Sequence, residues 1–197
     1  MMRSYSRINI AFILFTSLSA WLAIASISEI DLTFHEQITD YSCGAACLES
    51  VMEYWGTEVD QEAMLDSTPP MNPATGYTVG ELKDIALSRG LQAFAIIGNT
   101  TFLAGQIDKQ RPIIVPIMIT YNEYRFEFAS RAPIVGPVYE AFRDNVVLEY
   151  SHFVLVFEVD EDSVRVVDPM YGTVRIPKER FESMWAKREN AMLLVAN

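Results

Sequence analysis

The sequence has few cysteines, few basic residues and few histidines, and each shortage narrows what the protein can be. Its two cysteines, Cys43 and Cys47, cannot build a disulfide framework, so the fold must rest on a hydrophobic core. Lys and Arg number 15 against 26 Asp and Glu, for a formal net charge of -11. This balance argues against a nucleic-acid partner, because phosphate binding rewards clustered basic side chains.

Apolar residues, in contrast, are plentiful. They make up 50% of the 197 residues, and aromatic residues make up 12%, which is enough for the core of one compact domain. The sequence shows no internal repeat and no low-complexity tract. We therefore expect a single folded domain rather than a repeat array or a disordered chain.

The N-terminal residues resemble a targeting segment. Arg3 and Arg7 provide a positive region, and the following residues 8–27 carry no charge. Ala23-Ile24-Ala25 has the small-x-small form of a cleavage site, so the mature chain would begin at Ser26. The alternative is an uncleaved membrane anchor, because about 20 apolar residues can span a bilayer.

We accordingly predict a signal peptide or anchor at residues 1–25 and a folded domain at residues 26–197. Both alternatives place the domain outside the cytoplasm. We expect it in the periplasm, where an uncleaved N-terminal segment would be its only membrane contact and would anchor it to the inner membrane.

Hydrophobic periodicity, capping residues and prolines predict helices first and strands second. Helices are expected near residues 43–54, 60–65, 78–90, 101–109 and 177–185. Strands are expected at residues 91–97, 112–119, 152–159, 164–167, 171–176 and 191–195, the first two of them buried. This order indicates an α+β fold, with N-terminal helices packed on a C-terminal antiparallel sheet. The aromatic stretch 120–150 fits neither pattern, and is either a surface hairpin or helix, or a flap that contacts substrate.

Cys43 stands at the start of the first expected helix. Free backbone N–H groups and the helix dipole at that position favour the thiolate, which is the nucleophilic form of cysteine. Gly44 and Ala45 would leave space for a substrate carbonyl. The alternative for Cys43 is a small buried apolar residue, as most free cysteines are. Cys47, one helical turn later, is interpreted as a core residue rather than a redox partner.

A cysteine nucleophile needs a base, and the chain offers only His35 and His152. His35 lies in a polar stretch and is interpreted as a surface residue. His152 begins an apolar strand, and Asp168 ends the strand that returns beside it, so Asp168 can orient the imidazole. Taken alone, His152 could be a half-buried sheet histidine, and Asp168-Pro169 could be an ordinary strand-ending turn. Their joint occurrence favours a catalytic pair.

Gln37 is the fourth candidate, since a side-chain amide can donate to the oxyanion of a tetrahedral intermediate together with the Cys43 N–H. The residues from Gln37 through Cys43-Gly-Ala-Ala-Cys-Leu48 resemble the first motif of the C39 peptidases, the bacteriocin-processing family of papain-like fold. His152 before an apolar strand and Asp168-Pro169 resemble the second and third motifs. The likeness extends from about residue 37 to 195.

This resemblance implies a papain-like cysteine peptidase that cuts peptide bonds of a leader peptide or exported protein, typically after Gly-Gly. Familiar members are fused to a transporter with an ATPase, whereas this sequence has no phosphate-binding loop. It is more similar to stand-alone exported members, some of which accompany secretion systems for surface fibres or functional amyloid. A secretion-channel partner is therefore expected beside the peptide substrate.

Two other functions remain open at this stage. The same triad could act as an acyltransferase that passes its acyl group to an amine or thiol, or the domain could be a non-catalytic adaptor that holds a leader peptide. The proposed peptidase chemistry needs no metal and no organic cofactor. A zinc site built from the cysteines, His152 and Asp168 is disfavoured, because the two cysteines are spaced one turn apart on a helix and the sequence has no second cysteine pair.

Overall fold

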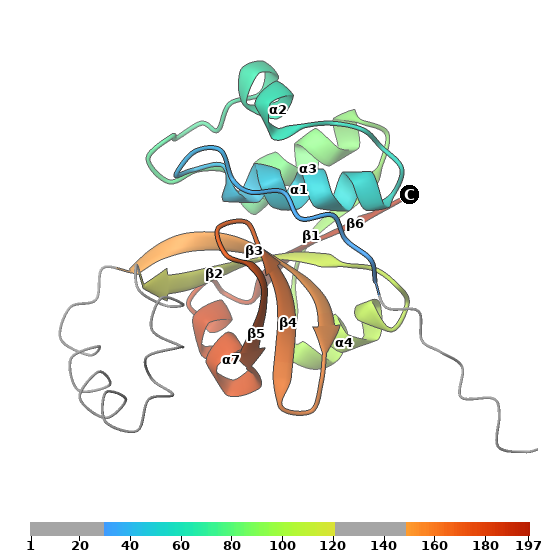
Figure 1. Ribbon diagram of the computed structural model, residues 1–197, viewed down its shortest axis with the longest axis vertical. Coiled ribbons are helices and arrows are strands. Elements are labelled where there is room, and N and C mark those ends of the chain that lie inside the picture. Colours follow the sequence, from blue (N-terminus) through green and yellow to red (C-terminus); the bar gives the residue numbers. More distant parts are fainter. Residues whose placement is uncertain (1–29, 121–148) are drawn as a thin grey trace, which may run out of the picture.

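The computed structural model describes residues 30–120 and 149–197, which contain helices and the strands of one antiparallel sheet (Figure 1). The helices are α1 (Cys43–Tyr54), α2 (Gln61–Ser67), α3 (Val79–Ser88), α4 (Thr100–Ile107) and α7 (Lys178–Ala186). The strands are β1 (Gln92–Ile97), β2 (Ile113–Thr120), β3 (Glu149–Val159), β4 (Ser163–Asp168), β5 (Gly172–Pro177) and β6 (Ala191–Ala196). The expected targeting segment 1–25 and nearly all of the aromatic stretch 120–150 lie outside the described residues.

The six strands form one sheet in the order β1-β6-β2-β3-β4-β5, and every pairing is antiparallel. Figure 1 shows α1, α2 and α3 gathered on one side of this sheet, with α4 and α7 on the other. The α+β architecture expected from the sequence is confirmed.

The helix boundaries follow from local capping chemistry. The Asp60 carboxylate accepts the Ala63 N–H at 2.6 Å and begins α2. Thr78 and Glu81 form both hydrogen bonds of a capping box and begin α3. Just past the ends of α1 and α3, Gly56 and Gly90 adopt φ values of +76° and +85°, a conformation that costs a residue with a side chain more than it costs glycine.

The centre of the sheet is apolar, because its middle strands are covered on both sides. In β2 the segment from Ile113 to Ile117 is fully buried, and it pairs with β3 in a register that places Ile117 opposite His152. Trp185 and Phe181 of α7 are also buried, and the Trp185 indole donates to the Ala191 carbonyl at 2.7 Å. This core makes the start of β3 a rigid position for a polar side chain.

The expectation of two buried strands was right for β2 and wrong for β1. β1 is an edge strand that pairs only with β6, and its Phe94 and Ile97 side chains are 49% and 73% exposed. An apolar run of six residues does not reveal whether a neighbouring strand or helix will cover it, so the sequence pattern could not separate these two cases.

Among the described residues, no helix combines the length and apolar character needed to cross a bilayer. The candidate span at residues 8–27 lies outside that part of the chain.

Candidate active site

Cys43 is the first residue of α1 and is buried against the sheet, with 7% of its surface exposed. The preceding residue, Ser42, does not cap the helix with its side chain. Its hydroxyl donates instead to the Thr39 carbonyl at 3.2 Å and accepts the Thr39 N–H at 3.0 Å. The first-turn N–H groups that a capping serine would occupy are therefore left for the cysteine, at the positive end of the helix dipole.

The surroundings of Cys43 favour its thiolate. Burial acts to raise the pKa of the Cys43 thiol, but a hydrogen bond from His152 and the charge of that imidazolium act in the opposite direction. The backbone N–H groups of Phe153 and Gly44 add to this stabilisation, and the net effect is a pKa below the usual value. A lowered pKa is what a nucleophilic cysteine requires.

His152 lies between Cys43 and Asp168. Its Nε2 is 2.9 Å from Asp168 Oδ1, and both side chains are almost completely buried. Because Nε2 donates to Asp168, the ring forms its hydrogen bond with Cys43 through the other nitrogen, Nδ1. Burial acts to lower the pKa of His152, but hydrogen bonds and charges from Asp168 and Cys43 raise it to about 10. The geometry is that of a thiolate–imidazolium pair oriented by a carboxylate.

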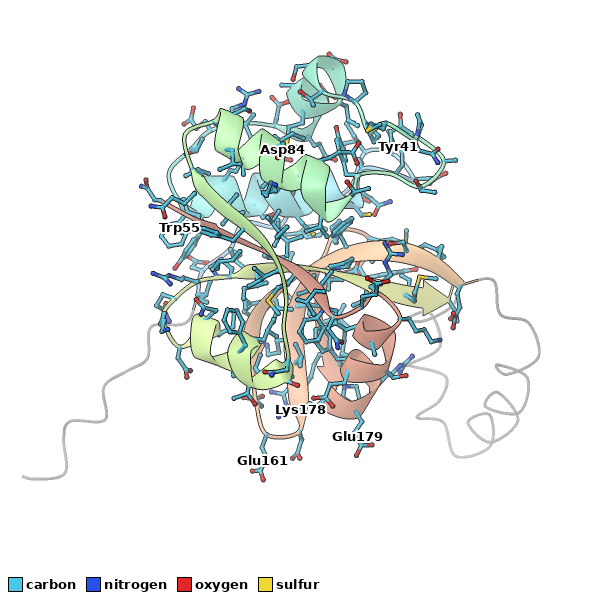
Figure 2. All side chains as sticks on the ribbon, turned by 180° about the vertical axis from the view of Figure 1, so that it is seen from behind. Tyr41, Trp55, Asp84, Glu161, Lys178 and Glu179 are labelled. Carbon is cyan, nitrogen blue, oxygen red and sulfur yellow. The ribbon has the colours of Figure 1, made fainter. Side chains whose placement is uncertain are left out.

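The β3–β4 hairpin brings these groups together. The second half of β3 pairs with β4, and the pairing of Leu155 with Val167 leaves Asp168, at the end of β4, within hydrogen-bond reach of His152. In Figure 2, Glu161 in the turn between the strands lies at the end of the molecule away from α1, α2 and α3, whereas Tyr41, in the turn before α1, is labelled on the side of those helices. The open end of the hairpin, with His152 and Asp168, is thus directed toward the start of α1, which follows Tyr41 by two residues.

Asp168 is held by more than the histidine. Its Oδ1 also accepts the Met170 N–H at 2.8 Å, and its carbonyl accepts the Tyr171 N–H at 3.1 Å. The intervening Pro169 carbonyl accepts the Gln37 N–H at 3.0 Å. The turn after β4 therefore both orients the carboxylate and holds the loop that carries Gln37.

Gln37 lies in the N-terminal segment of residues 30–42, which runs alongside α1 (Figure 1). Its side-chain Nε2 donates to the Thr39 carbonyl at 3.0 Å. Since an amide nitrogen carries two hydrogens, one N–H remains to donate to another acceptor. The structure thus places all four predicted site residues around the start of α1: Cys43 on the helix, His152 and Asp168 on the hairpin, and Gln37 on the adjoining segment.

The small residues after Cys43 serve packing rather than substrate access. A Cβ added to Gly44 would lie 3.0 Å from a Leu82 methyl carbon and 3.1 Å from the Phe153 ring, so glycine lets α1 approach α3 and β3. Ala45 is fully buried. The expectation that both residues make room for a substrate carbonyl was wrong, because their side-chain positions face the protein interior.

Cys47 differs from Cys43 although both lie on α1. It is 2% exposed, and burial raises the pKa of its thiol well above the usual value, with the charges of Cys43 and Asp168 acting in the same direction. This environment is that of a core residue, as the sequence analysis interpreted it. Within residues 30–120 and 149–197, no three His, Cys, Asp or Glu side chains converge as metal ligands would.

His35 is a partly exposed surface residue, and its side chain makes contacts that the sequence did not predict. Its side chain is 24% exposed and lies between two carboxylates of α1, with Nδ1 3.2 Å from Glu49 and Nε2 2.7 Å from Glu53. The Glu49 carboxylate also accepts a hydrogen bond from Gln61. Glu49 and Gln61 were missed altogether, because a polar residue in a helical pattern does not reveal that a loop distant in sequence will bury it.

Comparison with known proteins places this geometry in context. The chain is similar to the probable functional amyloid protease FapD of Pseudomonas fluorescens, with 25% identity over 158 residues that cover 76% of this chain and 55% of that protein. The chain thus spans about half the length of that curated relative.

Solved structures share the fold. A protein from Bacillus anthracis described as a C39-like peptidase aligns with 85% of this chain and 96% of its own, at 15% identity and a TM-score of 0.62. The peptidase domain of Streptococcus ComA aligns with 85% and 98%, at 19% identity and a TM-score of 0.60. A double glycine motif protease from an AMS/PCAT transporter, solved with its leader peptide, aligns with 85% and 93%, at 18% identity and a TM-score of 0.57.

These structures agree with the papain-like peptidase fold expected from the sequence. The model of the Peptidase_C39 like family matches residues 29–192, nearly all of the described chain. The chain therefore belongs to the Peptidase_C39 like family, which confirms the family resemblance of its motifs.

Proposed function

We propose that this protein is an exported endopeptidase that cleaves a leader peptide or an exported fibre-forming protein by thiol chemistry. One observation carries the proposal: the buried His152 donates from Nε2 to Asp168 at 2.9 Å while its other ring nitrogen faces the Cys43 sulfur. This arrangement supplies both the nucleophile and the proton carrier that peptide-bond cleavage needs.

In the proposed reaction, the Cys43 thiolate attacks the scissile carbonyl and forms a tetrahedral oxyanion. The Cys43 N–H and the Gln37 side-chain amide stabilise that oxyanion. The His152 imidazolium then protonates the leaving amine, and a thioester remains on Cys43. Neutral His152 next activates water, which hydrolyses the thioester and restores the thiolate–imidazolium pair. Asp168 keeps the ring oriented and stabilises its charged form throughout.

The substrate proposal draws on the comparisons. The relative in Pseudomonas fluorescens is named as a functional amyloid protease, and one structural neighbour is a double-glycine protease solved with a leader peptide. The first description supports a fibre-forming substrate, and the second supports cleavage of a leader peptide after Gly-Gly. A periplasmic location and a secretion-channel partner complete the proposal. The location derives from the N-terminal pattern of Arg3, Arg7 and Ala23-Ile24-Ala25, and the partner derives from the resemblance to stand-alone exported family members.

A set of synthetic peptides tests the activity and its preference together. Peptides with Gly-Gly, Gly-Ala, Ala-Gly or Ala-Ala at one fixed position are incubated with the wild type and with Cys43→Ala, and the products are identified by mass spectrometry. We expect hydrolysis after Gly-Gly by the wild type alone. Equal cleavage by folded Cys43→Ala contradicts the mechanism, and preferential transfer of the acyl group to an added amine identifies an acyltransferase instead.

Export is tested separately by N-terminal sequencing of protein from a periplasmic fraction. The expected N-terminus is Ser26 or a residue next to it. Protein found only in the cytoplasm with Met1 intact contradicts the proposed location without affecting the chemistry.

A further inference from the structure

Gln61 makes an unusual set of contacts for a side chain at the start of a short helix. It is the first residue of α2, yet only 6% of its surface is exposed. Its Oε1 accepts the Ile38 N–H at 3.1 Å, and its Nε2 donates to the Glu36 carbonyl at 2.8 Å and to Glu49 Oε2 at 3.2 Å. Both amide hydrogens and the amide oxygen are thus engaged.

Two of these bonds bracket Gln37. The Glu36 carbonyl belongs to the peptide group before Gln37, and the Ile38 N–H belongs to the peptide group after it. Gln61 therefore holds both peptide groups next to Gln37, as a neighbouring strand would. The Gln37 N–H, in the first of these groups, donates to the Pro169 carbonyl at 3.0 Å. That peptide group is consequently fixed from two sides, by α2 and by the turn that follows Asp168.

Glu49 determines which way the Gln61 amide points. A reversed amide would direct its oxygen at the Glu49 carboxylate and at the Glu36 carbonyl, which are both acceptors, and would direct its nitrogen at the Ile38 N–H. Glu49 is itself 9% exposed and lies on α1, the helix that begins with Cys43. The network therefore connects the nucleophile's helix to the backbone of Gln37 through two buried side chains.

We infer that Gln61, oriented by Glu49, is a positioning residue for peptide cleavage: it fixes the backbone of Gln37 so that the Gln37 amide meets the oxyanion. The inference rests on the proposed role of Gln37 as an oxyanion donor. Such donors act because they are held in place before charge develops, so loosening their support slows the chemical step. Gln61 contacts no reacting atom in this scheme.

The test uses Gln61→Met, which keeps nearly the length of the side chain and removes all three hydrogen bonds. Its matched control is Gln106→Met, because Gln106 is also a buried glutamine on a short helix, with 8% exposed, and bonds Arg111 instead. Kinetics are measured on the peptide that the wild type cleaves fastest in the set above. We expect kcat to fall by roughly 10- to 10²-fold in Gln61→Met, with KM changed less than threefold, and to stay near wild type in the control.

A double variant separates positioning from general damage. Gln37→Ala alone should lower kcat by roughly 10²–10³-fold. If Gln61 acts through Gln37, adding Gln61→Met to Gln37→Ala should lower kcat by less than about twofold further. The rate at which iodoacetamide alkylates Cys43 should match the wild type in Gln61→Met, since the nucleophile and His152 are untouched.

The outcomes are distinguishable. Three results would each overturn the inference and leave the peptidase proposal standing. The first is a wild-type kcat for Gln61→Met, and the second is a fall in kcat on adding Gln61→Met to Gln37→Ala that is as large as the fall in the wild-type background. The third is slowed alkylation of Cys43 in Gln61→Met. A wild-type kcat for Gln37→Ala would overturn the oxyanion assignment and this inference with it. Should Gln61→Met not fold, Glu49→Gln provides the second measurement, because it weakens the orienting bond while keeping its shape, and the same pattern is expected at a smaller amplitude.

Discussion

The two histidines of this chain are both paired with carboxylates, yet their neighbourhoods differ in burial and in what lies beyond the pair. His152 and Asp168 are almost completely buried, and His152 also forms a hydrogen bond with the Cys43 thiol. His35 is partly exposed between Glu49 and Glu53, and Glu49 also accepts a hydrogen bond from the Gln61 amide. Similar ionic contacts are thus assigned to proton transfer in the proposed mechanism at one place, and hold a loop at the other.

Burial explains much of this difference. Burial by itself acts to lower the pKa of His152, but inside the protein the hydrogen bonds and poorly screened charges of Asp168 and Cys43 raise it to about 10, so the imidazolium persists at neutral pH beside a thiolate. Glu53 is 48% exposed on its side chain, where solvent and salt weaken an ion pair to a fraction of a kcal/mol or about 1 kcal/mol. A histidine–carboxylate pair therefore identifies a catalytic centre only when its surroundings are considered.

The strongest test of the comparison replaces each histidine in turn. His152→Ala should lower kcat/KM by at least about 10⁴-fold, because both proton transfers are lost. His35→Ala should lower it no more than several-fold, since Glu49 still holds Gln61. Steady-state kinetics with circular dichroism as a check on folding measures both. A larger loss from His35→Ala than from His152→Ala would contradict the assignment of His152 as the base and of His35 as a residue that only holds the 30–42 segment.

Asp168→Asn should have the next largest effect. The amide can still orient the ring but removes the charge that raises the pKa of His152, so activity should persist above that of His152→Ala. In the wild type, kcat/KM should rise with pH as Cys43 loses its proton, below the usual thiol range, and should fall as His152 loses its proton near pH 10. The alkaline limb should move to lower pH in Asp168→Asn, and an unmoved limb would contradict the role of Asp168.

Cys47→Ala should affect stability rather than chemistry. Removing one buried sulfur should cost roughly 1–2 kcal/mol of unfolding free energy, measured by urea denaturation, while kcat/KM stays within about twofold. Iodoacetamide should label Cys43 first, because Cys47 is enclosed and the pKa of its thiol is raised. Faster labelling of Cys47, identified by peptide mapping, would exchange the roles of the two cysteines.

Glu53→Gln should have the smallest effect of the four. The exposed carboxylate contributes a screened contact to His35, so unfolding free energy should fall by less than about 1 kcal/mol and kcat should not change. The same substitution at buried Glu49 should lower kcat, as argued above. Equal kinetics for the two variants would show that attachment of the 30–42 segment does not matter to the reaction.

Much of the fold was predictable because its signals are local. Asp60, Thr78 with Glu81, and the glycines after α1 and α3 mark helix boundaries by chemistry within a few residues. Likewise, a short polar turn between two apolar strands predicts a hairpin, which brings Asp168 near His152 without knowledge of the rest of the chain.

The sequence by itself determined which groups are candidates for the reaction: one cysteine at a helix start, one histidine at a strand start and one aspartate at the end of its return strand. Only the tertiary structure decided what surrounds them. It exposed β1 at the sheet edge, turned Gly44 toward Leu82 and Phe153, and buried Gln61 against the 30–42 segment. These outcomes depend on contacts between residues far apart in the chain, and burial and hydrogen-bond partners at such distances have no periodicity for a sequence pattern to reveal.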